Sequence, residues 1–416
     1  MDVNFQGKRV TVMGLGRFGG GLGVTKWLLK QGAEVLVTDV AQESALSLQI
    51  AELGTHARLQ FALGEHRVED FTNTDVVVVN PAVPTPWNNK FLQAAWEVGV
   101  IVTTEIELVV KRLERKNVIG VTGTSGKSTT ASMIHAALCS AGKRCRLGGN
   151  IGGSLLGDLS TLQKDELVVL ELSSAMLWWL DRNGGWSPRI AVLTTVEPNH
   201  IDWHGSFEAY KKCKELLFVH QTEGDTALTQ DSDSSFEGLA VLGKHNERNA
   251  AVALLAVVAA GAELNLARVG IQQFCGLPHR LQLVHHRCYN DSKSTTPSAT
   301  KLAVDSFDDP SKVHLIVGGY DKKVDLRVLA NQSKRVARMY AIGATQKAIA
   351  ALATSDVDCF DSLESAVTTA KQNMEDGDVL LLSPGCASWD QFENYEQRGN
   401  LFCELVREVL PTQQVR

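Results

Sequence analysis

A glycine-rich loop between a strand and a helix constrains the fold of this chain more than any other feature. The apolar strand Val118–Val121 runs into Gly120-Val-Thr-Gly-Thr-Ser-Gly-Lys127-Ser128-Thr129, and a helix pattern follows over Ala131–Leu138. Amide groups of such a loop cradle phosphates, its lysine reaches the terminal phosphates, and its serine can bind magnesium. The predicted nucleotide contacts are Gly123, Thr124, Ser125, Gly126, Lys127, Ser128 and Thr129. A turn without a ligand is the alternative.

A second glycine-rich turn lies near the N-terminus. It separates the predicted strand Arg9–Met13 from a helix pattern that runs through Leu29, and the strand Glu34–Asp39 follows. This order is typical of dinucleotide-type sites, in which glycines let the backbone approach a diphosphate and an acidic residue accepts from a ribose hydroxyl. The candidate residues are Gly14, Gly16, Gly19 and Asp39. A tight strand–helix turn without a ligand is the other interpretation.

The whole chain alternates predicted strands with helices, which indicates α/β layers with mostly parallel sheets. Further strands are predicted over Asp75–Val79, Glu166–Leu170, Ile190–Thr195, Val313–Val317 and Val379–Leu382. With 416 residues, we expect three domains. These are a Rossmann-like N-terminal domain (1–116), a central P-loop ATPase domain (117–276) and a C-terminal Rossmann-like α/β domain (277–416).

Charge and composition restrict the class of partner. The chain has 41 basic and 47 acidic residues, so it lacks the positive excess of a nucleic-acid-binding or anionic-membrane surface. Its longest apolar run, Ala250–Ala260, is about half the ~20 residues that a membrane span needs. The chain starts Met-Asp-Val-Asn-Phe, without an export signal, so we expect a cytoplasmic protein.

The eight cysteines include no Cys-x-x-Cys pair, which argues against a disulfide framework or structural zinc. We therefore expect reduced thiols that serve mainly as small core residues.

Polar residues gather where two strands of the central segment end. Glu171 closes one strand, and Asn199 and His200 follow the next. Because ligands bind at the carboxyl ends of parallel strands, we expect this carboxylate and imidazole beside Ser128, around a magnesium ion that bridges nucleotide phosphates. A histidine in a structural hydrogen bond is the alternative.

The full set of motifs resembles the Mur ligase superfamily, and most closely its D-glutamate-adding branch. The motifs are the phosphate loop, Gly148-Gly-Asn150-Ile-Gly152, Glu171-Leu-Ser-Ser174, Asn199-His200-Ile-Asp202, Tyr210-Lys-Lys-Cys-Lys214, Gly243-Lys-His245-Asn246, Leu277-Pro-His-Arg280, Asn290-Asp291-Ser-Lys293, Gly318-Gly-Tyr-Asp-Lys322 and the long run Ser383–Gly399. The resemblance covers essentially the whole chain.

The resemblance implies an ATP-dependent ligase that adds D-glutamate to UDP-MurNAc-L-Ala through an acyl phosphate, as a monomer, in cytoplasmic peptidoglycan precursor synthesis. Lys127 would neutralise phosphate charge, and Ser128 and Glu171 would hold the first of two Mg²⁺ ions. Lys214, carbamylated by CO₂, would bind the second with His200. A surface lysine is the alternative for Lys214.

The same resemblance assigns the C-terminal residues. Asn246 and Arg280 would hold ATP across the domain junction, and Asp291 would take its ribose or base side. Asn150 would belong to the UDP-sugar site. The D-glutamate site would consist of Lys293, Thr295, Lys322, Ser388 and Tyr395, because two carboxylates removed from water need charged partners. Lys322 would also take part in catalysis.

The chain departs from the D-glutamate ligase pattern in places. Val40 and Ala41 follow Asp39, and Asn80-Pro81-Ala82 replaces Ser-Pro-Gly. The sequence therefore does not determine which residues bind the uracil and the diphosphate. Trp178 and Trp179 replace a polar continuation after Glu171. Three alternatives therefore stay open: a Mur-type ligase for another amino acid, a nucleotide-binding switch without ligase activity, and an NAD-dependent dehydrogenase, which uses only the first glycine turn.

Overall fold

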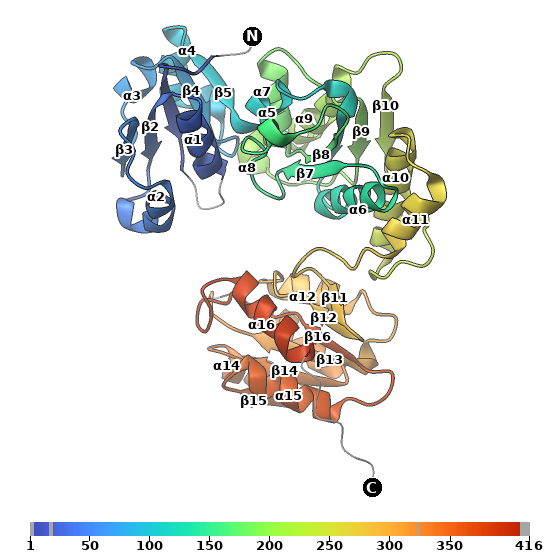
Figure 1. Ribbon diagram of the computed structural model, residues 1–416. Helices are drawn as coiled ribbons and strands as arrows, with labels where there is room; N and C mark the ends of the chain where they lie inside the picture. The colour runs from blue at the N-terminus through green and yellow to red at the C-terminus, as the bar shows by residue number, and fades with distance from the viewer. Residues whose placement is uncertain (1–3, 16–19, 323, 408–416) are drawn as a thin grey trace. The chain divides into compact units, whose positions relative to one another are not determined.

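The computed structural model describes residues 4–15, 20–322 and 324–407, and its strands form three sheets. Figure 1 follows them along the chain from the N-terminus to the C-terminus. In the described ranges, a single pair of neighbouring strands, in the third sheet, is antiparallel. The predicted α/β fold with mostly parallel sheets is therefore confirmed.

The first sheet has the order β3-β2-β1-β4-β5, with every pair parallel. Its strands are β1 (Arg9–Met13), β2 (Glu34–Asp39), β3 (Leu59–Leu63), β4 (Val76–Val79) and β5 (Ile101–Thr104). The helices are α1 (Gly20–Lys30), α2 (Ser47–Leu53), α3 (Glu69–Thr72), α4 (Lys90–Glu97) and α5 (Glu105–Val110). Four consecutive valines form β4 because a strand covered on both faces has no polar side.

The second sheet has the order β10-β9-β6-β8-β7, again all parallel. Its strands are β6 (Val118–Thr122), β7 (Cys145–Gly149), β8 (Leu167–Glu171), β9 (Ile190–Leu193) and β10 (Thr226–Thr229). The helices are α6 (Lys127–Ser140), α7 (Ser174–Arg182), α8 (Ile201–His204), α9 (Phe207–Val219), α10 (Lys244–Ala259) and α11 (Leu264–Gln272). The strand order reverses at β6, so the phosphate loop lies at the position where ligands bind in such sheets.

The third sheet has the order β11-β12-β16-β13-β14-β15, and β11 runs antiparallel to β12. Its strands are β11 (Gln282–His285), β12 (Cys288–Asn290), β13 (Val313–Gly318), β14 (Arg338–Ile342), β15 (Val357–Phe360) and β16 (Val379–Leu382). The helices are α12 (Pro297–Val304), α13 (Arg327–Ala330), α14 (Gln346–Leu352), α15 (Leu363–Asn373) and α16 (Tyr395–Arg407).

The first two sheets share one hydrophobic core. Val10 and Val35 of the first sheet belong to the same buried cluster as Val168 and Leu170 of the second. The chain accordingly divides into two compact units: Met1–Ser235 with Arg248–Ile271, and Phe236–Glu247 with Gln272–Arg416. The exact domain boundaries at 116 and 276 stay a prediction.

A cluster of tryptophans joins the segment after β4 to the second sheet's helices. The ring centroids of Trp87, Trp178 and Trp203 lie 5.4 to 5.9 Å apart in pairs. Trp203 also donates from its indole nitrogen to the Val83 carbonyl at 3.0 Å. Trp178, one of the departures from the family pattern, is therefore half-buried and packs against the other two rings.

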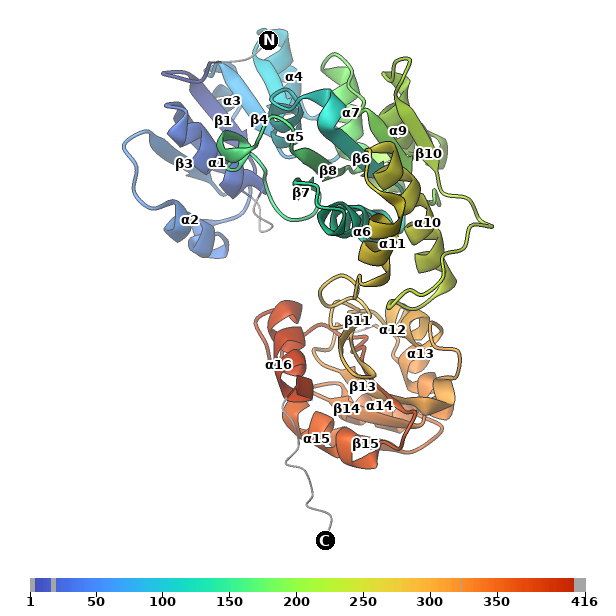
Figure 2. The same cartoon turned by 45° about the vertical axis from the view of Figure 1, so that its right-hand side comes forward.

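Helix α10 contains all but the last residue of the longest apolar run of the sequence, and Figure 2 shows it beside α6 and α11. Ser140 at the end of α6 donates to the Leu266 carbonyl of α11 at 3.0 Å, which ties these helices together. Among the described residues, no helix combines the length and apolar character that crossing a membrane requires.

The cysteines differ from the prediction. All eight are free thiols, but Cys213, Cys288 and Cys386 are the buried ones. Cys139, Cys275 and Cys359 are exposed, and Cys145 and Cys403 are half-buried. The expectation that they serve mainly as core residues is wrong, because a small thiol is tolerated equally at the end of a surface helix or strand.

Candidate active site

Two glycines of the phosphate loop adopt backbone angles that other residues disfavour. Gly123 has φ 150° and Gly126 has φ 83°. A Cβ on Gly123 would collide with the Thr194 hydroxyl, and one on Gly126 with the Asn249 side chain. The left-handed Gly126 also lets α6 begin at once, four residues before the predicted Ala131. Glycine is therefore needed at both positions for the loop to keep this shape.

The segment after β9 supports the loop from the side. The Thr194 hydroxyl donates to the Ser125 carbonyl at 2.6 Å, and the Thr124 amide donates to the Thr195 carbonyl at 2.6 Å. The Thr124 hydroxyl accepts from the Glu197 amide at 3.0 Å. These bonds hold the loop in a shape fixed before any ligand binds, which is what phosphate recognition requires.

Glu171 ends β8 beside the loop and is 1% exposed. Its Oε1 accepts from the Asn150 side chain at 2.8 Å. Its Oε2 is one of four buried side-chain polar atoms in the described part of the chain that have no hydrogen-bond partner. A buried oxygen without a partner is costly, and a hard cation such as Mg²⁺ would satisfy it. Together with Ser128 in the first turn of α6, Glu171 fits a magnesium site.

Lys214 on α9 is buried and reaches the same place. Its Nζ donates to the Gly123 carbonyl at 2.6 Å, and its side chain is 1% exposed. Burial, and then the charge of Lys127, lower the pKa of Lys214 to about 7. Near neutral pH a large share of this lysine is therefore a neutral amine, the form that reacts with carbon dioxide.

Tyr210 connects the residues around Lys214, and the sequence analysis gave it no role. Its hydroxyl lies 3.0 Å from the Thr124 hydroxyl, and the Lys214 Nζ lies 4.5 Å from its ring centroid. The centroid of the His200 ring lies 6.0 Å from that of Tyr210. The spacing of Tyr210 and Lys214 on one helix could have revealed their contact, because residues four apart share a face.

The structure therefore brings Lys127, Glu171 and Lys214 together at the phosphate loop, whose Thr124 carbonyl accepts from Lys127 at 2.8 Å. His200 precedes α8 in a left-handed conformation with φ 50°, and it is exposed. Its role as a metal ligand stays a prediction.

A cleft of about 260 Å³ lies between the first two sheets, within the first unit. It is lined by the predicted residues Gly14 and Asn150, and also by Asn80, Ala82 and Glu105. Glu105 was not expected there; burial raises its pKa, and Ser154 donates to it at 2.6 Å. The predicted Gly16 and Gly19 lie outside the described residues.

Asp39 is buried at the end of β2, where it holds the first glycine turn. Its two oxygens accept from the Leu15 and Ala41 amides at 2.9 Å each. The structure thus shows a positioning use for this carboxylate, and ribose binding by Asp39 stays a prediction.

In the second unit, two predicted lysines lie against aromatic rings. The Lys293 Nζ is 5.2 Å from the Tyr395 centroid, and the Lys322 Nζ is 5.4 Å from the Trp389 centroid. Lys322 also lies 3.5 Å from the Thr295 carbonyl. Both lysines are exposed, whereas Ser388 is buried. Exposed ammonium groups beside hydroxyls suit an anionic ligand.

The predicted nucleotide residues of the second unit are held by internal bonds. Asp291 is buried; it accepts from the Leu281 amide at 3.1 Å and the Ser383 hydroxyl at 2.7 Å. Burial raises the pKa of Asp291 to about 6. The Asn246 side chain donates to the Leu242 carbonyl at 2.6 Å, and Arg280 is exposed. Nucleotide binding by these three residues stays a prediction.

Arg398 is a further residue that the sequence analysis left without a role. It is 1% exposed, and its guanidinium donates to the carbonyls of Ser292, Cys386 and Ala387 at 2.9 to 3.2 Å. One buried side chain thus joins the loop before Lys293 to the loop before Ser388. Its position as the fourth residue of α16 gave no signal, because the Ser292 carbonyl lies 106 residues away in the sequence.

Comparisons with known proteins identify the family of this chain. Three family profiles match the chain in order: the MurD-like N-terminal domain of Mur ligases over residues 8–104, the Mur ligase middle domain over 121–240, and the Mur ligase glutamate ligase domain over 279–386. A UDP-N-acetylmuramoylalanine–D-glutamate ligase of Roseiflexus sp. is 34% identical over 96% of this chain and 98% of its own length. The chain belongs to the Mur ligase family.

Other similar proteins carry the same description. The UDP-N-acetylmuramoylalanine–D-glutamate ligase of Desulfatibacillum aliphaticivorans is 33% identical to this Mur ligase, and the match covers 97% of the present chain and 99% of the relative. Among solved structures, the UDP-N-acetylmuramate–alanine ligase of Thermotoga maritima has a TM-score of 0.55 at 17% identity, covering 95% and 98% of the two chains. The MurF ligase of the same organism, in complex with ADP, has a TM-score of 0.54 at 16% identity, covering 97% and 96%. These two likenesses support the fold.

Proposed function

We propose that this Mur ligase uses ATP to join D-glutamate to UDP-MurNAc-L-Ala in peptidoglycan precursor synthesis, and that it acts as a carboxylate–amine ligase. The observation that carries the ATP-dependent step is the buried Glu171 oxygen without a partner, next to a preformed phosphate loop. The choice of D-glutamate rests on full-length similarity to relatives with that name and on the Ser383–Gly399 run.

The chemistry explains why these groups are needed. A carboxylate is a poor electrophile, so the γ-phosphate of ATP is first transferred to the carboxylate of UDP-MurNAc-L-Ala, which gives an acyl phosphate and ADP. The amine of D-glutamate then attacks the acyl carbon, and the tetrahedral intermediate expels phosphate. Lys127 neutralises charge on the transferred group, where positioning and cations supply most of the catalysis. Bound Mg²⁺, held by Ser128 and Glu171, would supply further charge neutralisation on the phosphates.

We further propose that Lys214 carries a carbamate. Its neutral amine would attack carbon dioxide and lose a proton, which replaces a cation with an anionic oxygen ligand. The support is its burial beside the loop and the lowered pKa, since an ammonium there would repel a metal ion. His200 would be a second ligand of the same ion.

For the other substrates, we propose that the cleft lined by Gly14 and Asn150 binds the UDP-sugar, with Asp39 at the end of β2 as a further contact. Lys293, Thr295, Lys322, Ser388 and Tyr395 would bind D-glutamate, and Asn246, Arg280 and Asp291 would contact ATP. The boundaries 1–116, 117–276 and 277–416, a cytoplasmic location and a monomeric state are part of the same proposal. Size-exclusion chromatography with light scattering tests the monomer.

Release of ADP and phosphate in the presence of UDP-MurNAc-L-Ala, with a screen of D- and L-amino acids, tests the function. We expect turnover to require D-glutamate. Equal turnover with L-lysine, diaminopimelate or L-alanine would reject the branch. ATP hydrolysis that is indifferent to every amino acid would instead favour a nucleotide-binding switch.

A further inference from the structure

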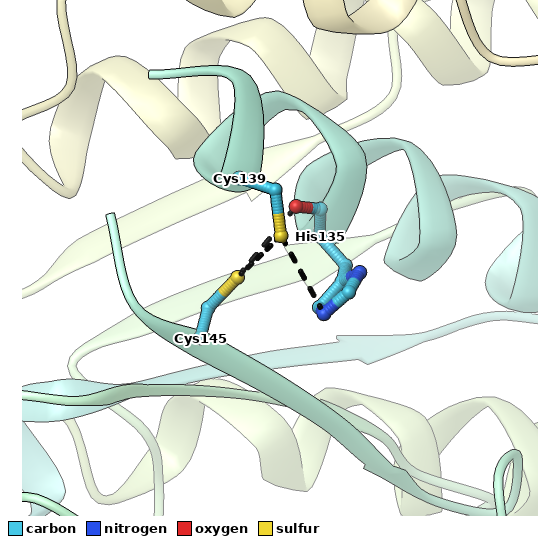
Figure 3. A group of neighbouring side chains, drawn as sticks. All are labelled: His135, Cys139 and Cys145. Atoms are coloured by element: carbon cyan, nitrogen blue, oxygen red, sulfur yellow. Dashed lines mark hydrogen bonds between the residues drawn. The ribbon is translucent and has the colours of Figure 1, made fainter. Parts of the chain in front are cut away.

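Three side chains with soft metal ligands meet at the end of α6 that is opposite to the phosphate loop. His135 and Cys139 lie on the helix, and Cys145 is the first residue of β7. The Cys139 sulfur is 3.5 Å from the Cys145 sulfur and 3.8 Å from the His135 Nε2. One ligand atom from each of the three residues lies within 4.8 Å of the others. Figure 3 shows the Cys139 sulfur between the other two side chains.

Local backbone structure produces this arrangement. His135 and Cys139 are four residues apart, so they share one face of α6. The helix then ends in a tight turn, in which the Gly142 amide donates to the Cys139 carbonyl at 3.0 Å and the Lys143 amide to the Leu138 carbonyl at 2.9 Å. The turn returns the chain to β7, with Cys145 facing the helix. The three ligands are therefore positioned by hydrogen-bonded backbone and not by a mobile loop.

The distances suit a tetrahedral thiophilic ion. With metal–sulfur bonds of about 2.3 Å and metal–nitrogen bonds of about 2.0 Å, two ligands on a tetrahedral centre lie roughly 3.5 to 3.8 Å apart. The two measured separations from the Cys139 sulfur, 3.5 and 3.8 Å, are of that size. Three protein ligands would leave the fourth position open to water, since Cys139 is exposed.

The charges nearby also permit a cation. Arg144 and Arg146, which flank Cys145, are paired with Asp165 at 2.9 Å and Glu166 at 2.7 Å. The carboxyl end of α6 carries the negative end of the helix dipole, which favours positive charge.

We propose that His135, Cys139 and Cys145 bind a thiophilic divalent ion of the Zn²⁺ class, with an open fourth position. This site is separate from the magnesium site, because the helix rise puts about 18 Å between Lys127 and Cys139. An ion here would connect the end of α6 to the start of β7. It would therefore stabilise the folded first unit by preferential binding to it.

The test is a Co²⁺ titration of the full chain under anaerobic conditions with a non-thiol reductant. We expect one ion per chain, a thiolate-to-cobalt charge-transfer band with tetrahedral d–d bands, and displacement of both by Zn²⁺. Cys139→Ser and Cys145→Ser should each weaken Co²⁺ binding by at least roughly a hundredfold. Changes to residues that only contact the ligands cost up to about that much, and the loss of a ligand should cost no less. Cys275→Ser and Cys359→Ser, which remove exposed thiols elsewhere, are the matched controls and should bind normally.

A melting experiment with and without Zn²⁺ gives a second measurement that does not depend on catalysis. Zn²⁺ should raise the Tm of the wild type and of the two control variants, but not of Cys139→Ser. His135→Gln, a mild change at a half-buried position, keeps the test valid if a cysteine variant folds poorly; its cobalt spectrum should weaken. The proposal is overturned if the reduced wild type gives no cobalt–thiolate band, or if that band survives both cysteine substitutions.

A disulfide is the competing chemistry for Cys139 and Cys145. Mass spectrometry of the metal-free protein, isolated without reductant, distinguishes the two. A chain that keeps two free thiols there and then takes up Co²⁺ supports the metal site. A chain that has lost two hydrogens through a Cys139–Cys145 crosslink, and that binds no Co²⁺ after reduction, overturns it.

Discussion

Lys214 on α9 donates from Nζ to the carbonyl of Gly123 in the phosphate loop at 2.6 Å, although 91 residues separate them. The contact places a lysine with a lowered pKa against the phosphate loop. A lysine at the surface stays hydrated and charged, whereas this one is enclosed beside Lys127, so burial and a like charge lower its pKa. That environment disfavours an ammonium, and it leads to the first prediction.

Lys214→Ala should lose most turnover, and small carboxylic acids should restore part of it by occupying the vacated space. Activity is measured in bicarbonate-free buffer with and without formate or acetate, after circular dichroism has confirmed the fold. Lys212→Ala, a neighbouring exposed lysine, is the control. Wild-type turnover of Lys214→Ala rejects the metal role, and an inactive variant that no acid rescues leaves the carbamate without support.

Glu171→Gln should raise the Mg²⁺ concentration for half-maximal turnover by roughly tenfold or more. The amide can still bond to Asn150, but it lacks the anionic oxygen that has no other partner in the described structure. A Mg²⁺ titration of the rate measures this, with Glu208→Gln on exposed α9 surface as the control. An unchanged Mg²⁺ dependence would contradict the assignment.

Lys127→Ala should reduce turnover by roughly a hundredfold or more, through lost charge stabilisation in phosphoryl transfer. Its Nζ already lies over the loop, 2.8 Å from the Thr124 carbonyl. Steady-state kinetics at saturating ATP separate this loss from weaker nucleotide binding. A folded variant with near-normal kcat means that the loop does not carry the chemistry.

Arg398→Met should raise the KM for D-glutamate by roughly fivefold or more, equivalent to about 1 kcal/mol. Three carbonyls, of Ser292, Cys386 and Ala387, would lose their donor, and the loops with Lys293 and Ser388 would lose their common anchor. Because Arg398 acts through these loops, the KM for ATP should change less. Arg398→Lys should recover part of the loss, and Arg407→Met is the control. Equal changes in both KM values would indicate general unfolding instead.

Asp291 should make the second unit less stable as pH rises from about 4 to 6. Its pKa is raised from 3.8 to about 6 by burial, so the folded state binds more protons than the unfolded state in this window. The ionised Asp291 therefore lowers the free energy of unfolding by its full amount above pH 6 and by nothing below pH 4. This amount is at most about 3 kcal/mol. Hydrogen exchange of the β12 and β16 amides, compared with Asp291→Asn, measures it. A pH-independent difference between the two proteins would contradict the raised pKa.

Local sequence patterns were sufficient for the phosphate loop and for part of the secondary structure. Six of the ten strands in the first two sheets and the helix after Gly126 follow from apolar periodicity and glycine placement, which act over a few residues, whereas β3, β5, β7 and β10 were not predicted. The loop's chemistry is local too, because consecutive amides and one lysine make the site. Resemblance to the Mur ligases then supplied residues such as Lys214 that spacing alone would have left on the surface.

Tertiary packing decided what surrounds those residues. The Glu171 oxygen without a partner, the Tyr210 contacts and the Arg398 anchor all join segments that the sequence keeps far apart. The tryptophans after Glu171 looked like a departure from the family, yet Trp178 packs against Trp87 and Trp203. Burial, and the pKa changes that follow from it, depend on which surfaces meet. A sequence pattern encodes the face that each element buries, but the contacts across that face exist only once the elements have packed together.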